Sequence, residues 1–180
     1  MKATGIVRRI DDLGRVVIPK EIRRTMRIRE GEPLEIFTDA GGSVIFKKYS
    51  PVGELSTFAT QMCDAMHKTC GHACVVCDRD GIIAAAGSVR RELDGKPLST
   101  ELEQVMSSRQ TTHSENGLPI TPTAPHILAS TVQPIIAGGD LCGCVALVAG
   151  DLAVGETEQK LMQLAALFLV AGGARLLEKF

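Results

Sequence analysis

Short apolar blocks alternate with polar turns over the first fifty positions of the chain. One pair of extended segments is separated by a polar turn at residues 11–14. A second pair is separated by a turn containing Gly41 and Gly42, which tolerate the positive φ that hairpin turns require. Between the two pairs, apolar residues recur with the period of a helix. The pattern predicts the order strand, strand, helix, strand, strand, with these elements at residues 4–10, 15–18, 19–28, 34–38 and 43–48.

The predicted helix carries a row of cations. We expect Pro19 at its first position, where a residue without an N–H is tolerated. Four basic residues follow at i, i+3, i+4 and i+7 and therefore share one face of the helix. They are Lys20, Arg23, Arg24 and Arg27. Such a row is either an ordinary solvated face or a surface that presents positive charge to a partner outside the protein.

The remaining 130 residues predict a separate body. We call residues 1–50 the head and residues 51–180 the body, with a linker at residues 51–54 and a globular domain at residues 55–180. The body pattern predicts an antiparallel sheet with helices on one side, as in GAF or PAS sensor domains. Its expected helices are residues 54–68, 98–109 and 156–180, its expected strands are residues 73–77, 81–86, 131–137 and 141–149, and residues 110–129 are an expected loop over a ligand site.

Charge is divided unevenly between these two parts. The head holds eleven Lys/Arg and seven Asp/Glu, a net charge of +4, whereas the body holds nine and fourteen, a net charge of −5. A basic head on an acidic body indicates nucleic acid as a partner.

The head is too small for its apolar content. A chain of this length buries only about 60% of its unfolded surface and is marginally stable without a metal, a disulfide or a partner. The head has no cysteine, yet its predicted strands carry many apolar residues. We therefore expect the heads of two chains to interleave around one core. The strand residues concerned are Ile6, Val7, Val16, Val17, Ile18, Leu34, Ile36, Val44, Ile45 and Phe46.

The predicted C-terminal helix also has more apolar surface than one sheet face requires. With the helix at residues 54–68, it could form a bundle with a second subunit, and the alternative is ordinary core packing. If head and body each pair with a different neighbour, the assembly is a tetramer. The residues concerned are Leu161, Leu164, Leu167, Phe168 and Leu176.

The cysteines are the main candidates for chemistry in the body. Cys70, Cys74 and Cys77 have a C-x3-C-x2-C spacing, flanked by His67 and His72. An iron–sulfur or zinc site is one reading. However, a strand at residues 73–77 would place Cys74 and Cys77 on opposite faces, about 10 Å apart. We therefore expect no metal and no cofactor, and buried thiols there and at Cys142 and Cys144.

No other pattern indicates catalysis. The sequence contains no evident nucleophile–base pair, phosphate loop or carboxylate dyad, so we do not expect an enzyme. His113 and His126 could line a pocket in the expected loop. Residues 1–10 lack the apolar core of a signal peptide, and the most apolar segment, residues 164–174, is shorter than the roughly twenty residues that span a bilayer. With six cysteines, these features predict a cytoplasmic protein.

Residues 14–24 read GRVVIPKEIRR. With this signature, the head resembles the AbrB-type DNA-binding domain. The resemblance implies an α+β protein whose heads form a swapped-hairpin β-barrel from two chains and bind double-stranded DNA. It implies that the DNA is contacted by Arg8, Arg15, Arg23 and Arg24. Four further cations are supporting candidates: Lys2, Arg9, Lys20 and Arg27.

A head of this type on a body of this length resembles AbrB-type regulators of spore-forming bacteria that carry a GAF-like domain. This implies a nucleoid-associated activator and repressor of sporulation genes. It is expected to be an obligate homodimer through the head and a tetramer through the body. A small ligand in the GAF-like domain would tune its DNA affinity. The alternatives are an antitoxin-like interaction module and a metal or redox sensor. Arginine suits both phosphates and guanine edges, so the sequence leaves the mode of DNA recognition open.

Overall fold

The computed structural model describes residues 4–50 and 52–177. The chain divides into two compact units, Met1–Tyr49 and Ser50–Phe180. From here on the head is residues 1–49 and the body is residues 50–180, and each is described by itself.

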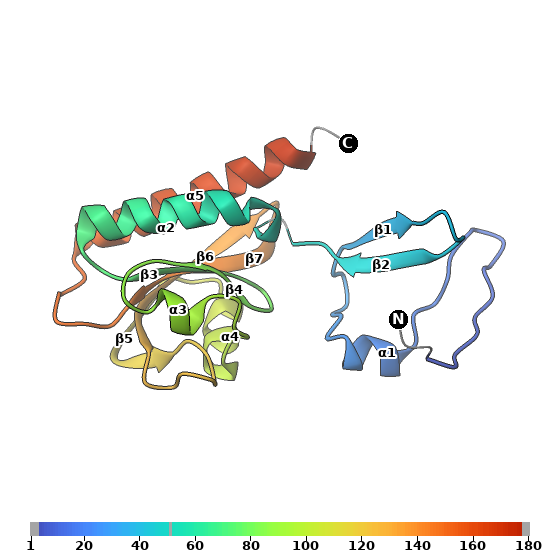
Figure 1. Cartoon of the computed structure of the whole chain (residues 1–180), viewed down its shortest axis with the longest axis horizontal. Helices are drawn as coiled ribbons and strands as arrows, with labels where there is room; N and C mark the ends of the chain where they lie inside the picture. The colour runs from blue at the N-terminus through green and yellow to red at the C-terminus, as the bar shows by residue number, and fades with distance from the viewer. Residues whose placement is uncertain (1–3, 51, 178–180) are drawn as a thin grey trace. The chain divides into compact units, whose positions relative to one another are not determined.

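The head contains one helix and one β-hairpin (Figure 1). Helix α1 is Lys20–Thr25, and the antiparallel strands are β1, Leu34–Thr38, and β2, Val44–Lys48. Leu34 lies opposite Lys48, and Thr38 lies opposite Val44. Gly42 takes a φ of 81° in the turn between the strands, a conformation that costs glycine little. The second predicted hairpin is therefore present.

The prediction of strands at residues 4–10 and 15–18 is wrong for the single chain. Over residues 4–18 the structure has a turn at 11–14 but no strand. A strand needs a neighbour to take up its N–H and C=O groups, and β1 and β2 pair with each other. The order within one head is therefore α1, β1, β2.

Helix α1 is shorter than the sequence indicates. Its end is a Schellman motif, in which the Ile28 N–H donates to the Arg23 carbonyl at 2.7 Å and the Arg27 N–H to the Arg24 carbonyl at 3.2 Å. Arg27 has a φ of 51°, in the left-handed region. It therefore leaves the expected row of cations. Pro19 lies just before the helix, with a ψ of 149°, and not at its first position.

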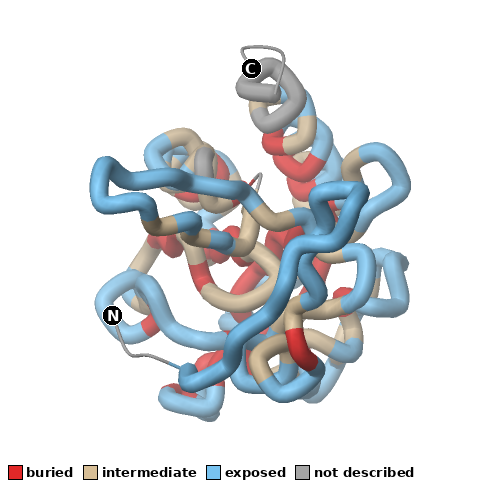
Figure 2. Tube along the Cα trace, turned by 90° about the vertical axis from the view of Figure 1, so that its right-hand side faces the viewer, coloured by how far each residue is buried: buried red, intermediate tan, exposed pale blue. Residues whose placement is uncertain are grey.

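The head of one chain has almost no core. Among residues 4–49 only Pro19 is buried, and the trace of the head is drawn exposed along most of its length in Figure 2. Val7 is 90% exposed and Val17 is 72% exposed. A fold of this kind leaves most of its hydrophobic stabilisation unrealised. Further large apolar residues of the head are also exposed: Ile6, Ile10, Leu13, Val16, Met26, Ile36, Phe37, Val44 and Phe46.

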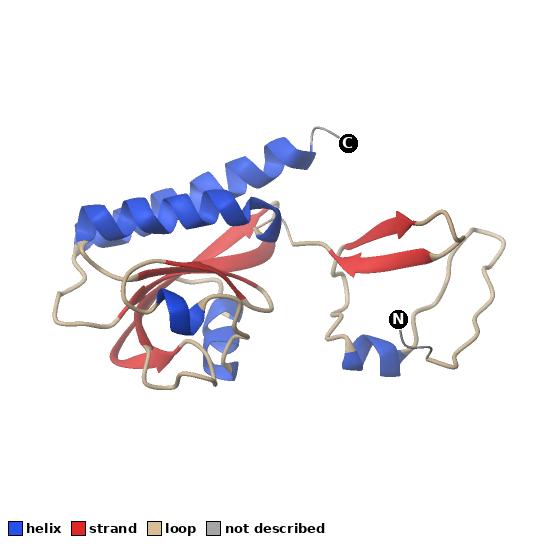
Figure 3. Ribbon diagram, in the orientation of Figure 1, coloured by secondary structure: helices blue, strands red, loops and turns tan. Residues whose placement is uncertain are grey.

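The body is built on one five-stranded antiparallel sheet, with the strand order β4-β3-β7-β6-β5. Strands are drawn red and helices blue in Figure 3. The strands are β3, Cys74–Asp78, β4, Ile82–Ala85, β5, Thr112–Pro119, β6, Leu128–Ala137, and β7, Asp140–Val148. The helices are α2, Ser56–Cys70, preceded by a short 3-10 turn at Gly53–Leu55, α3, Arg90–Leu93, α4, Thr100–Ser107, and α5, Glu156–Leu177. The expected α+β class and antiparallel sheet with helices are confirmed.

Both faces of this sheet are covered. Alternate side chains of β3 point to opposite faces, so that Val76 packs with α2 and α5, whereas Val75 packs with α3 and α4. On the first face, Cys63 of α2 and Met162 of α5 are buried against the sheet. On the second face, Leu102 of α4 is buried against it. The expectation of helices on one side is therefore wrong. The strands β3 and β7 are apolar at nearly every position, which is typical of strands buried on both faces.

Two elements of the body differ from the sequence reading, and one agrees closely. Helix α4 lies within the helix expected at residues 98–109, and Ser99 caps it by accepting a hydrogen bond from the Leu102 N–H at 3.0 Å. Strand β5 lies within the segment expected to be a loop, and α3 was not expected. The sequence of β5, THSENGLP, is polar and contains Gly117. It becomes a strand because it pairs with β6 along the sheet edge, with an irregular register between His113 and Leu118.

None of the helices within the described residues combines the length and the apolar character needed to cross a membrane.

Candidate nucleic-acid interface

A turn closed by Asp11 presents Arg15. One carboxylate oxygen of Asp11, Oδ1, accepts hydrogen bonds from the backbone N–H of Leu13 at 3.1 Å and of Arg15 at 2.7 Å. The other oxygen, Oδ2, accepts from Arg15 Nε at 2.8 Å. The Asp11 N–H also donates to the Arg15 carbonyl at 3.0 Å. Arg15 is thus held to Asp11 by its N–H, its carbonyl and its side chain.

The turn between β1 and β2 repeats this design. Asp39 accepts from the backbone N–H of Gly41 at 2.9 Å and of Ser43 at 2.8 Å, and its own N–H donates to the Ser43 carbonyl at 3.1 Å. Glycine takes a positive φ at the fourth position of both turns, at Gly14 and Gly42. The sequence carries the signal for this repeat as D-x-x-G at residues 11–14 and 39–42. Sequence reasoning recognised both segments as turns but missed the role of the aspartates.

The hydrogen bonds lower the pKa of both turn carboxyl groups. For Asp11 the Arg15 N–H is the main cause of the lower pKa, followed by the Arg15 side chain. For Asp39 the Ser43 N–H is the main cause of the lower pKa, followed by the Ser43 side chain. These bonds favour the ionised form, which therefore stabilises the folded turns.

We expect both turns to loosen in acid. A carboxyl group whose pKa is lower in the folded state contributes stability above its usual pKa, and this contribution is lost as the pH falls through the lowered value. The usual value is 3.8 for Asp11 and Asp39, so the change lies below that pH. The amide resonances of Arg15 and Ser43, followed by NMR, should move with this titration. In Asp11→Asn the movement at Arg15 should disappear while that at Ser43 remains. Unchanged titration at Arg15 would contradict the assignment.

Helix α1 brings three of the candidate cations together. Lys20 and Arg24 are exposed, and Arg23 is half-buried. The Nε atom of Arg23 is covered and has no hydrogen-bond partner within the described residues. A covered donor of this kind is costly unless an acceptor reaches it. Within the described residues, helix α1 therefore presents two exposed cations and a third whose Nε atom has no acceptor.

The other candidates are spread around α1. Arg8 and Arg9 are exposed in the extended segment before the Asp11 turn, and Arg15 is exposed at its end. Arg27 is exposed just beyond the helix. Lys2 lies outside the described residues. No finding tests the roles of these residues, so they stay predictions at this point.

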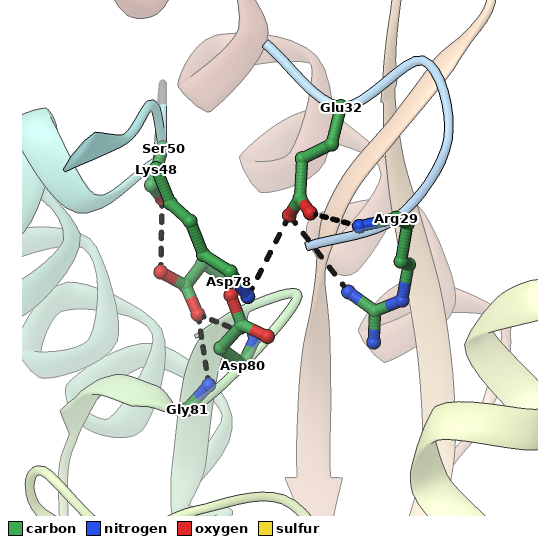
Figure 4. Close-up of polar contacts among 7 residues, drawn as sticks. All are labelled: Arg29, Glu32, Lys48, Ser50, Asp78, Asp80 and Gly81. Carbon is green, nitrogen blue, oxygen red and sulfur yellow. Dashed lines mark hydrogen bonds and ion pairs between the residues drawn. The ribbon is translucent and has the colours of Figure 1, made fainter. Parts of the chain in front are cut away.

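Two carboxylates anchor the chain near the ends of the hairpin and at the start of the body (Figure 4). Within the head, Glu32 accepts from the Arg29 N–H at 2.7 Å and lies 3.8 Å from Lys48 Nζ. Within the body, the Ser50 hydroxyl donates to Asp78 at 2.9 Å. The second oxygen of Asp78 accepts from the N–H groups of Asp80 and Gly81, each at 2.8 Å, as Figure 4 shows. Each unit therefore fixes its own side of the junction at residues 49 and 50.

The cysteines of the body face different cores. Cys74 packs on the side of α2 and α5, and Cys77 on the side of α3 and α4. Cys142 and Cys144 also face opposite sides, because the register between β6 and β7 shifts near Ile135. Within residues 4–50 and 52–177, no group of three or more His, Cys, Asp or Glu side chains is arranged to hold a metal ion.

The thiols interact in pairs. Cys77 and Cys144 lie directly opposite each other in the register of β3 and β7. Their mutual hydrogen bond, together with burial, raises the pKa of Cys77 well above its usual value. A bond to Cys63, together with burial, likewise raises the pKa of Cys74. Both groups therefore stay protonated at neutral pH, whereas the thiolate is the reactive form.

The two histidines of the expected ligand site are engaged separately. His113 lies between Thr131 Oγ1 at 2.8 Å and Gln159 Nε2 at 2.7 Å. His126 lies 3.2 Å from a carboxylate oxygen of Glu92. The small ligand of the body stays a prediction.

The chain matches a model of a family of transcription factors. A family model described as "Stage V sporulation protein T C-terminal, transcription factor" matches residues 54–171. Stage V sporulation protein T of Bacillus subtilis is 49% identical over 172 residues, which cover 94% of this chain and 97% of that protein. The chain therefore belongs to the stage V sporulation protein T family, which confirms the family resemblance found in the sequence.

The head and the body each have further similarities. A model described as "Antidote-toxin recognition MazE, bacterial antitoxin" matches residues 7–54. The N-terminal DNA recognition domain of the Bacillus subtilis regulator AbrB is 59% identical, with a TM-score of 0.24, and covers 28% of this chain and 94% of that chain. A methyl-accepting chemotaxis protein, residues 122 to 287, is 14% identical, with a TM-score of 0.55, and covers 68% of this chain and 90% of that chain. This last likeness shows the fold of the body alone.

Proposed function

We propose that the protein is a homo-oligomeric regulator of transcription that binds double-stranded DNA through its head. The observation that carries the proposal is a head with almost no core of its own that carries the arginines implied by the family resemblance. Arg8, Arg15, Arg23 and Arg24 are the proposed DNA contacts. They are supported by the remaining cations of the head: Lys2, Arg9, Lys20 and Arg27.

The similarity of the head to the DNA recognition domain of AbrB supports this assignment. The family supports a role as activator and repressor of sporulation genes. The protein then acts by binding and not by catalysis, in the cytoplasm where the nucleoid lies.

The antitoxin model matches the same head segment. An antitoxin-like protein would bind a protein partner, so DNA binding with a phosphate-led salt dependence separates the two readings.

Salt dependence tests the proposal directly. If about eight cations of the dimer meet phosphates, the logarithm of the affinity should fall against the logarithm of salt concentration with a slope near −7. Fluorescence anisotropy with a labelled mixed-sequence duplex measures this slope. An affinity that does not change with salt would contradict phosphate-led binding.

We propose that two heads form one core. The exposed apolar residues of the head, from Ile6 to Phe46, are more than a soluble domain of this size leaves uncovered. Residues 4–10 and 15–18 have the composition of strands but no partner strand among the described residues 4–49 of their own head. A second copy would supply both the partner strands and the cover, in the swapped-hairpin arrangement that the family resemblance implies.

We also propose that the bodies pair through α5. Met162, Ala165 and Leu169 of α5 are buried in the body, whereas Leu164, Leu167 and Phe168 are exposed. Phe168 stacks on Phe58 of α2, with ring centroids 5.1 Å apart, so α2 extends this face. Core packing within one chain therefore accounts for only one side of α5. The side chain of Leu176, also expected in the bundle, lies outside the described residues.

Charges on the outer face of α5 should split the assembly. We expect the double substitution Leu164→Glu/Leu167→Glu to convert tetramers into dimers, because pairing would bury two uncompensated carboxylates in each chain. Native mass spectrometry reads the change, and DNA binding by the dimeric head should remain. Leu152→Glu is the matched control, because Leu152 is also an exposed leucine but lies before α5. Tetramers that persist in the double variant would contradict this interface.

A further inference from the structure

Asp11 places a negative charge in contact with one of the proposed DNA-binding arginines. Its two carboxylate oxygens have separate partners. Oδ1 accepts from backbone N–H groups and shapes the turn, whereas Oδ2 accepts from Arg15 Nε at 2.8 Å. The Arg15 side chain is 69% exposed and that of Asp11 is 38% exposed. The ion pair therefore lies on the surface that the proposed function assigns to DNA.

The position of this bond leaves the end of Arg15 available. A guanidinium group has five N–H donors, and Nε supplies one of them. With Nε bound to Asp11, the two terminal nitrogens still provide the paired donors that fit a phosphate or a guanine edge. The bond also restricts the rotation of a long side chain before any ligand arrives, which reduces the entropy lost on binding.

The turn at Asp39 shows that the fold does not need this ion pair. Its backbone hydrogen bonds match those of the Asp11 turn, yet the residue at the position of Arg15 is Ser43. A serine bound to the aspartate suffices to close such a turn. The Arg15 side chain is therefore not needed to close the first turn.

We propose that Asp11 is a positioning residue for DNA recognition, which orients the Arg15 guanidinium by holding its Nε. This inference rests on the proposed function of Arg15. Asp11 carries a negative charge, which DNA repels. Removal of a negative charge from a DNA-binding surface should by itself strengthen binding. A positioning role predicts that removal of the Asp11 charge weakens DNA binding.

Asp11→Asn isolates this role. The asparagine carbonyl can still accept the two backbone hydrogen bonds of the turn, but its NH₂ group cannot accept from Arg15 Nε. Asp39→Asn makes the same change in the matching turn, where no arginine is held. The affinities of the full-length variants for two labelled duplexes, one of mixed sequence and one selected from a random pool by the wild-type protein, should be measured at one salt concentration. Thermal unfolding of each variant checks its fold.

We expect Asp11→Asn to weaken binding to the selected duplex by about threefold to tenfold. This is the size expected when one exposed ion pair is lost from each half of a dimer. Asp39→Asn should bind like the wild type. In an Arg15→Ala background, Asp11→Asn should cause no further loss, because the group that it positions is absent. Slower exchange of the Arg15 Nε–H proton in the wild type than in Asp11→Asn, measured by NMR, would support the ion pair directly.

Several outcomes would overturn the positioning role. These are equal or tighter binding by Asp11→Asn, an equal loss in Asp39→Asn, or a further loss in the Arg15→Ala background. Failure of the proposed function looks different. In that case the wild type would not bind either duplex in a salt-dependent way, or Arg15→Ala would bind as tightly as the wild type.

Discussion

Replacement of both Arg23 and Arg24 by alanine is expected to weaken DNA binding by about a thousandfold, because a dimer loses four arginines and each well-placed contact is worth about 1 kcal/mol or more. The salt slope should become shallower by about 3 to 4, because fewer counterions are released. Anisotropy titrations over a range of salt concentrations measure both effects. Neither side chain is part of a buried core, so the head should still assemble.

The body offers a matched control for this pair. Arg90 and Arg91 are also adjacent arginines on a short helix, α3. Arg90 lies 3.6 Å from Asp64, within the body. The double substitution Arg90→Ala/Arg91→Ala removes the same charge from the chain and should leave DNA affinity nearly unchanged. Equal losses from the two pairs would mean that net charge matters and not the position of Arg23 and Arg24. Unchanged affinity of the Arg23/Arg24 variant would refute the site assignment.

Gly143→Ala is expected to destabilise the body by more than about 3 kcal/mol or to prevent its folding. Gly143 lies in β7, at the centre of the sheet, opposite Asp78 of β3 and Ile135 of β6. A Cβ atom there would overlap the carbonyl oxygen of Cys77 and press against the Asp78 backbone. Backbone on a neighbouring strand cannot move aside as the end of a side chain can, so the ladder between β3 and β7 would have to open.

Urea unfolding monitored by circular dichroism measures this effect. Gly150→Ala is the control, because a Cβ atom at Gly150 meets nothing within 4 Å and the residue has no positive φ. Its effect should be within about 0.5 kcal/mol of zero, as for ordinary surface substitutions. If Gly143→Ala unfolds at the same urea concentration as the wild type, the close contact between β3 and β7 is wrong.

The elements that depend on neighbouring residues in the sequence could be predicted. Ser99 has the side chain of a helix cap, and it caps α4, which lies within the helix expected at residues 98–109. Gly41 and Gly42 indicated the hairpin of β1 and β2, and the alternation around Cys74 and Cys77 indicated that they face opposite sides. These signals lie in neighbouring residues, so they can be read without knowing which distant parts of the chain are in contact.

The elements that depend on distant partners could not be predicted. Residues 4–10 have strand composition but lack a partner strand within the part of the chain that the structure describes, whereas the polar β5 has little strand character and gains a partner in β6. Arg27 occupies a left-handed position that usually favours glycine, so the helix seemed to continue through it. At the candidate site the arginines were evident from a family signature, but the role of Asp11 required the positions of its two oxygens.

The lack of a core in the head has a consequence for how the protein responds to its own abundance. If a head folds only with a second copy, folding and association are one reaction, and the stability of the head rises with protein concentration. Dilution then removes the DNA-binding surface itself and not only its avidity. The body, with two cores on its own sheet, does not share this dependence. A cell would thus set the threshold for regulation through the number of chains it makes.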